Sequence, residues 1–175
     1  LRQGNGPRKV TDMLWLPEGF LTVTRDSLNF QAHGERRKTE SVELACSAAN
    51  PLLSRLDGRA ETWIYCPAQQ TRLLRINHMK PTQIAGSVVL EGRRKQGGFA
   101  IEPTGKWVVV PAAEKSEHGM CIVDVQREQE AVCFAQLPLR QAIFSADGST
   151  IYGIDRRGRA WTWRLADLLR ESSER

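Results

Sequence analysis

The sequence lacks the features that identify several large classes of protein. No apolar run approaches the roughly 18 residues needed to cross a bilayer, and no C-x-x-C pair suggests a zinc ribbon or a thioredoxin-type site. Neither G-x-S-x-G nor a kinase-like set of motifs is present, so nucleophilic catalysis has no support. Nothing at the start reads as a signal peptide. We therefore expect no catalytic residues, no metal and no cofactor.

Cysteine and histidine are also scarce. The cysteines are Cys46, Cys66, Cys121 and Cys133, and free thiols in a reducing cytoplasm are the simplest interpretation. Cys121 and Cys133 fall on neighbouring predicted strands, where we expect two packed thiols. His118 stands three residues before Cys121, but no second pair of metal ligands lies nearby in the sequence. The predicted location is cytoplasmic.

The composition that is present is typical of a globular domain. Hydrophobic residues make up 41% and charged residues 26% of the 175-residue chain. The formal net charge of +5 permits a polyanionic partner without demanding one. Residues 1–9 contain two glycines and a proline and are predicted to be a linker. Because the chain begins with Leu1, we expect it to be processed or part of a longer polypeptide.

A repeat of β-hairpins runs through the rest of the chain. The turn glycines are Gly19, Gly58, Gly105 and Gly148. They recur at intervals of roughly 40 to 45 residues, the length of one four-stranded propeller blade. We therefore predict an all-β propeller portion over 10–165, with about four blades of antiparallel strands. The predicted blades lie near 10–46, 51–90, 98–137 and 140–165. A generic antiparallel sandwich is the alternative.

The fourth unit resembles a WD40 repeat. It runs from Phe144-Ser-Ala-Asp-Gly148 through Asp155-Arg-Arg-Gly158 to Trp163, which matches that family's hairpin, tight turn and tryptophan position. Arg164 replaces the aspartate of the Trp-Asp pair, and no Gly-His dipeptide precedes any blade, so the family's hydrogen-bonded tetrad cannot be complete. The third unit is a looser copy, and the first two match in spacing only. The resemblance implies a divergent WD40-like propeller that binds other proteins through its rim loops.

The fourth unit also lacks a fourth strand. After Trp163 the residues are good helix formers, and Leu165, Leu168 and Leu169 form an apolar stripe. We expect 166–175 to be a short helix or tail that caps the edge of the propeller. WD40 rings most often contain seven blades, so four blades would form an open arc with an exposed sheet face at each end. We expect the ring to be completed by the rest of its own polypeptide, by a second chain or by a symmetric copy.

Basic residues cluster on two loops that the blade order places on one rim. The predicted partner-binding residues are Arg93, Arg94, Lys95, Arg156, Arg157 and Arg159. Arginine suits carboxylates and phosphates because its planar fork donates two parallel hydrogen bonds. The alternative is that these are solvated hairpin tips. Tyr152, Trp161 and Trp163 lie within predicted strands, so we expect them to pack in the core rather than to stack on bases.

These observations together predict a noncatalytic protein–protein interaction platform that forms part of a larger β-propeller. It would recognise or assemble a partner through its rim loops, and the resemblance implies a scaffold or sensor module beside a separate effector domain. The alternative is the binding of nucleic acid or another polyanion through the basic rim. No association with a membrane is expected.

Overall fold

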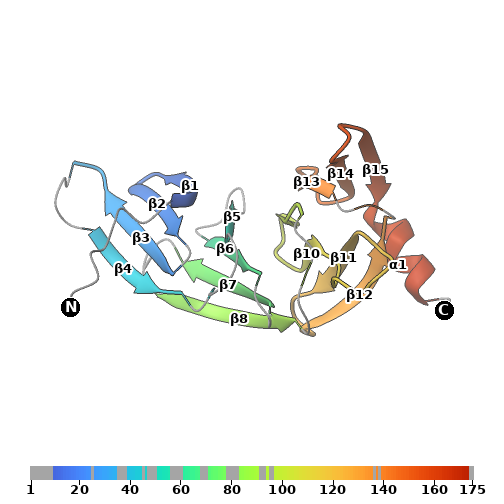
Figure 1. The fold of residues 1–175 in the computed structure, drawn as a ribbon, viewed down its shortest axis with the longest axis horizontal. Helices are drawn as coiled ribbons and strands as arrows, with labels where there is room; N and C mark the ends of the chain where they lie inside the picture. The colour runs from blue at the N-terminus through green and yellow to red at the C-terminus, as the bar shows by residue number, and fades with distance from the viewer. Residues whose placement is uncertain are drawn as a thin grey trace.

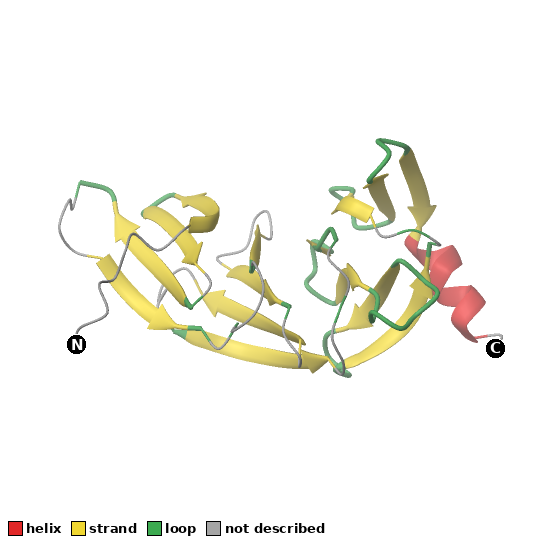
Figure 2. Ribbon diagram, viewed as in Figure 1, coloured by secondary structure: helices red, strands yellow, loops and turns green. Residues whose placement is uncertain are grey.

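The chain folds into a curved row of antiparallel sheets. The computed structural model describes residues 10–24, 26–34, 39–44, 46, 51–55, 61–67, 71–77, 83–90, 94, 97–135, 137 and 139–173. In this part of the chain, fifteen strands form four sheets, and one helix follows them (Figures 1 and 2). This confirms the predicted all-β propeller fold and rules out the two stacked sheets of a sandwich.

Each sheet is one blade, and its strands lie side by side in chain order. Blade 1 contains β1 (Val10–Leu16), β2 (Gly19–Thr24), β3 (Ser27–Ala32) and β4 (Thr39–Glu43). Blade 2 contains β5 (Leu52–Arg55), β6 (Glu61–Cys66), β7 (Thr71–Asn77) and β8 (Ile84–Leu90). Blade 3 contains β9 (Ala100–Ile101), β10 (Trp107–Pro111), β11 (Met120–Asp124) and β12 (Gln129–Phe134). Blade 4 contains only β13 (Leu139–Phe144), β14 (Thr150–Asp155) and β15 (Ala160–Arg164).

The apolar core lies between neighbouring blades. Blade 2 and blade 3 are each covered on both faces, and the middle strands β6, β10 and β11 are accordingly buried along nearly their whole length. In β11, for example, every residue is buried. Three clusters of buried side chains join blade 1 to blade 2, blade 2 to blade 3, and blade 3 to blade 4. Each blade is therefore stabilised mainly by its neighbours, as in other repeat architectures.

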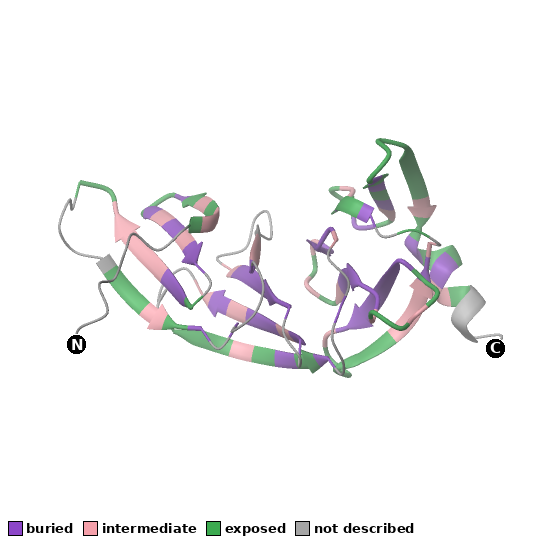
Figure 3. Cartoon of the chain, viewed as in Figure 1, coloured by how far each residue is buried: buried purple, intermediate pink, exposed green. Residues whose placement is uncertain are grey.

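In the described part of the chain, no blade packs against the two outer faces of the row. On blade 1 the side chains of Met13 and Trp15 alternate with inward-facing leucines, and Trp15 is 60% exposed. On blade 4, Ile143 pairs with Tyr152, and Ile143 is 62% exposed. Figure 3 shows the contrast between the buried central strands and the exposed strands of blade 4. The arc has the blades carrying the first and last strands at opposite ends (Figure 1), so both end faces remain apolar and accessible.

Glycines permit the closest approach between blades 3 and 4. Gly98 N donates to Leu139 O at 2.8 Å, and a Cβ atom at Gly98 would lie 2.5 Å from Ala142 N. The side chain of any other residue would therefore push the inner strands of the two blades apart. The predicted hairpin glycine Gly148 has a φ of 74°, in the left-handed region that its turn requires. Gly58 lies outside the described residues.

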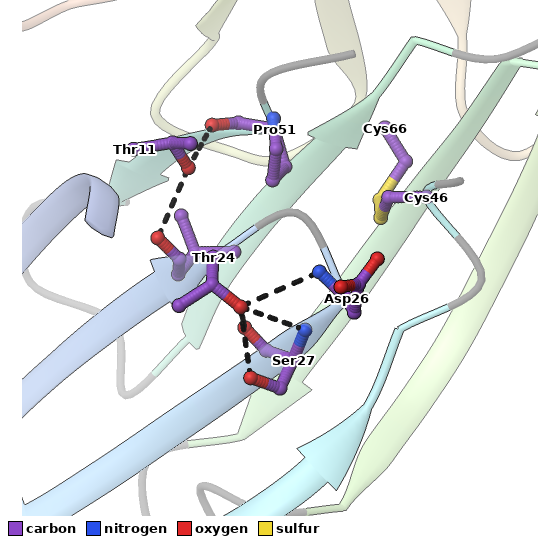
Figure 4. Close-up of a disulfide and its surroundings, with 8 residues drawn as sticks. Thr11, Thr24, Asp26, Ser27, Cys46, Pro51 and Cys66 are labelled. Atoms are coloured by element: carbon purple, nitrogen blue, oxygen red, sulfur yellow. Dashed lines mark hydrogen bonds between the residues drawn. A yellow bond between two sulfur atoms is a disulfide. The ribbon is translucent and has the colours of Figure 1, made fainter. Parts of the chain in front are cut away.

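The cysteine prediction was wrong, because all four cysteines form disulfides. Cys46 follows β4 of blade 1 and bonds to Cys66 at the end of β6 in blade 2, with their Cα atoms 5.1 Å apart (Figure 4). Cys121 and Cys133 lie directly opposite each other on β11 and β12, and they bond within blade 3. One disulfide therefore joins two blades and the other joins two neighbouring strands.

Hydrogen bonds from β1 reinforce the junction that the first disulfide spans. The Thr11 hydroxyl lies 3.0 Å from Val23 O and 3.3 Å from Pro51 O and can donate its hydrogen to either, so it lies between its own blade and the start of blade 2 (Figure 4). Asp12 Oδ2 accepts a hydrogen bond from Leu53 N at 2.8 Å. Hydrogen bonds between side chains and backbone, together with a disulfide, thus join blade 1 to blade 2.

The helix α1 (Leu165–Ser173) confirms the predicted short C-terminal helix, but it packs between blades 3 and 4 rather than over the edge of the propeller. It contacts β12 and β15, and its side chains Leu165 and Leu168 are buried in the cluster between blades 3 and 4. Within the described residues, no helix is long and apolar enough to cross a membrane.

Candidate partner-binding rim

One of the predicted basic residues, Arg94, has a role other than the predicted one. Arg94 is buried rather than displayed on the rim. Its guanidinium forms an ion pair with Glu130 of β12, and Nη1 donates to Pro111 O at 3.4 Å. Arg94 also bridges to Ala113 through the backbone. The charge of Arg94 is therefore neutralised by Glu130 within blade 3. Its neighbours Arg93 and Lys95 lie outside the described residues.

The other predicted residues lie at the turn between β14 and β15. Arg156, Arg157 and Arg159 are exposed, and the turn that carries them is organised by Asp155. This carboxylate accepts hydrogen bonds from Arg157 N at 2.8 Å and from Arg159 N at 3.0 Å. Gly158 N closes the turn on Asp155 O at 3.0 Å, with a φ of 78° at Gly158. The Asp-x-x-Gly spacing thus has a direct structural reason.

Asp155 also holds two side chains of the rim. Arg159 Nε donates to Asp155 Oδ2 at 2.7 Å, and Trp161 Nε1 donates to the same oxygen at 3.3 Å. Burial opposes the charge of this carboxylate, but the hydrogen bonds from Arg159, Arg157 and Trp161 outweigh it and lower the pKa of Asp155 to about 2. Asp155 is therefore ionised at neutral pH, and it offsets much of the charge of Arg159.

Stacked side chains continue from Arg159 into the sheet. The guanidinium of Arg159 lies 5.3 Å from the centre of the Trp161 ring, within the range of a cation–π interaction. The rings of Trp161 and Trp163 are stacked at 6.0 Å, and Trp163 packs against Phe134 of blade 3 at 5.1 Å. The stack therefore runs from the solvent-exposed rim to the interface between blades 3 and 4.

A pocket of about 330 Å³ lies beside this stack. It is lined by Ala135, Leu137, Leu139, Arg159, Trp161 and Trp163. Most of its wall is apolar, and Leu137 and Trp161 remain 43% and 41% exposed. Leu137 belongs to the segment that joins β12 to β13, Leu139 is the first residue of β13, and the tryptophans belong to β15. Topologically, that segment and the turn between β14 and β15 lie on the rim where the sequence predicted partner binding.

The aromatic residues were only partly predicted. Trp163 packs in the core as expected, whereas Trp161 and Tyr152 are exposed large side chains. Trp161 and Trp163 alternate along β15, so both rings lie on one face of the strand, where they stack. Trp161 is exposed on β15, the outermost described strand of blade 4. The pocket formed with the segment from blade 3 had no signal in the sequence.

The thiol groups offer no metal site in their oxidised form. Sγ atoms of Cys121 and Cys133 and a carboxylate oxygen of Glu130 lie within 4.8 Å of one another. A thiolate, not a disulfide sulfur, is the metal ligand, and Glu130 is already paired with Arg94. His118, the other ligand considered from the sequence, is exposed in the loop before β11.

Comparisons with known proteins agree on the fold. No family model matches the chain, and no curated protein matches it. Among solved structures 383 chains match. One of them is hydrazine synthase of Kuenenia stuttgartiensis, with 15% sequence identity and a TM-score of 0.61 over 86% of this chain and 44% of that chain. The chain therefore spans less than half of that structure, and at this identity the likeness shows the fold alone.

Proposed function

We propose that this chain is a noncatalytic recognition module that forms part of a larger β-propeller and binds a protein partner through its rim. The observation that supports this most directly is the pair of exposed apolar end faces, marked by Trp15 at one end and Ile143 at the other. Propeller blades normally bury such faces against further blades. The faces favour completion of the ring by material beyond these four blades.

The rim of blade 4 supports the recognition role. Its turn presents charged side chains on a rigid sheet, and the adjoining pocket offers an apolar anchor site. Exposed aromatic and arginine side chains beside a pocket are typical of the residues that dominate protein interfaces. The hairpin at Gly148 and the turn at Asp155 are consistent with a divergent WD40-like repeat. Binding of a polyanion receives less support, because Arg94 is buried and Arg159 is paired with Asp155.

The two disulfides favour an oxidising compartment for this module. The expectation of a cytoplasmic location depended on free thiols, and the structure contains none. Disulfides persist in extracytoplasmic and secreted proteins and are rare where thioredoxin and glutathione keep thiols reduced. We therefore expect this chain to bind its partner in an oxidising compartment.

Sedimentation of the purified chain tests the incomplete ring. We expect association above the 19.7 kDa monomer, because each end face must be covered. Trp15→Arg and Ile143→Arg place a charge on the two faces, and the double variant should sediment as a monomer with an unchanged β-sheet circular dichroism spectrum. The matched control is Ile84→Arg, at an exposed apolar position of β8 away from the end faces. A monodisperse wild-type monomer would contradict the proposal.

A further inference from the structure

Blade 4 differs from the other blades because its sheet ends at the third strand. In blades 1, 2 and 3 the third strand pairs with a fourth strand, whereas the sheet of blade 4 ends at β15. Four of the five residues of β15 are exposed, but every residue of the corresponding strand β11 in blade 3 is buried. The outer edge of β15 therefore presents a row of backbone donors and acceptors with no strand beside it in the described part of the chain.

Two further features adjoin this edge. The apolar pocket lined by Trp161, Trp163 and Leu137 opens beside it. Arg157 is exposed in the turn that precedes β15, and Arg164, the last residue of β15, is also exposed. Asp155, the carboxylate that organises this turn, already accepts hydrogen bonds from Arg159 and Trp161. The surroundings of the edge are therefore both apolar and basic.

We propose that the outer edge of β15 accepts an extended segment of a partner protein in which apolar and acidic residues alternate. This inference rests on the proposed role of the chain as a recognition platform. Backbone hydrogen bonds to an open sheet edge provide affinity, and alternate side chains of the added strand provide specificity. One apolar side chain enters the pocket beside Trp161, and the acidic side chains meet Arg157 and Arg164. The partner strand thereby completes blade 4.

Hydrogen exchange and fluorescence anisotropy test this proposal with a defined probe. The probe is a labelled peptide of about seven residues, the length of a typical strand, in which leucine and glutamate alternate. We expect it to bind and to slow amide exchange in β15. A peptide with lysine in place of glutamate should bind less tightly, and one with alternate prolines should not bind, because proline removes the backbone donors.

Charge reversal at the edge gives the matched comparison. Arg157→Glu combined with Arg164→Glu should weaken binding by about fivefold to thirtyfold, since exposed ion pairs contribute up to ~1 kcal/mol each and 1.4 kcal/mol is tenfold in affinity. Arg140→Glu, an equal change of charge on the exposed inner strand β13, should leave binding unchanged. Leu137→Ser should weaken binding of the leucine peptide more than binding of an alanine peptide.

Each other occupant of the edge predicts a different result. If the β15 amides that point away from β14 are already protected in the free chain, and dilution does not release them, a segment of the chain itself fills the edge and the proposal is overturned. Protection that disappears on dilution would assign the edge to a second copy, which also overturns it. The peptide is also titrated into the Trp15→Arg, Ile143→Arg double variant, which alters the end faces but retains β15. Binding of the peptide to this variant therefore tests the edge of β15 independently of ring completion.

Discussion

The disulfide between Cys46 and Cys66 makes the sharpest prediction about stability. It joins residues 20 apart in sequence, and Cys121–Cys133 joins residues 12 apart. In the chain-entropy account, closing loops of these lengths contributes about 3.3 and 2.8 kcal/mol at 25 °C. Domains of this size are stable by only about 5–15 kcal/mol. Reduction of both bonds should therefore remove a large share of the free energy of unfolding.

Urea denaturation measures this effect. The oxidised chain should unfold at a higher urea concentration than the chain in reductant, and Cys46→Ala with Cys66→Ala should lose about 3 kcal/mol. Reductant should then destabilise this double variant only by the contribution of Cys121–Cys133, which provides the internal control. A thiol titration of the unfolded, unreduced protein should detect no free cysteine. Detection of four thiols in protein folded under oxidising conditions would refute the reasoning.

Two further predictions concern the junction and the rim of blade 4. Gly98→Ala should destabilise the chain by about 1–3 kcal/mol in urea denaturation, because its Cβ would overlap the backbone of Ala142. The control is Gly86→Ala, whose Cβ meets only the end of the Arg75 side chain at 3.4 Å and which should be neutral or slightly stabilising. Equal effects of the two substitutions would contradict this role for Gly98. Because the pKa of Asp155 falls from 3.8 to about 2 on folding, its contribution to stability is complete above pH 4 and is lost as the pH falls towards 2. The difference in unfolding free energy between wild type and Asp155→Asn should shrink over that range, and a constant difference would show that the charge has no part in it.

The repeat was visible in the sequence because its chemistry is local. Turn glycines such as Gly148 need a backbone conformation that few other residues adopt, and Asp155 caps its own turn through hydrogen bonds to residues two and four positions ahead. Alternation and spacing then set the strands and their order. The sheet fold and the three-stranded last blade therefore followed from short-range patterns.

The site was less predictable because it depends on contacts between distant segments. Arg94 has the appearance of a rim residue in sequence, yet its partner Glu130 is on another strand and draws it into blade 3. The pairing of Cys121 with Cys133 could be anticipated from neighbouring strands, but whether two thiols are oxidised depends on the compartment, which spacing does not encode. The pocket likewise requires Leu137 of one blade linker and Trp161 of the next blade.

The helix α1 explains how blade 4 can pack firmly against blade 3 while the outer edge of β15 stays without a neighbouring strand in the described part of the chain. Leu165 and Leu168 of α1 fill apolar space between blades 3 and 4. A helix satisfies its backbone hydrogen bonds internally, so α1 covers apolar surface without offering a ladder of donors and acceptors to β15. The two tasks of a fourth strand are thereby divided: α1 supplies the apolar cover, and the hydrogen bonds along β15 are left for a strand from elsewhere. This division predicts that Leu168→Ala destabilises the fold, while the edge of β15 still discriminates between peptides.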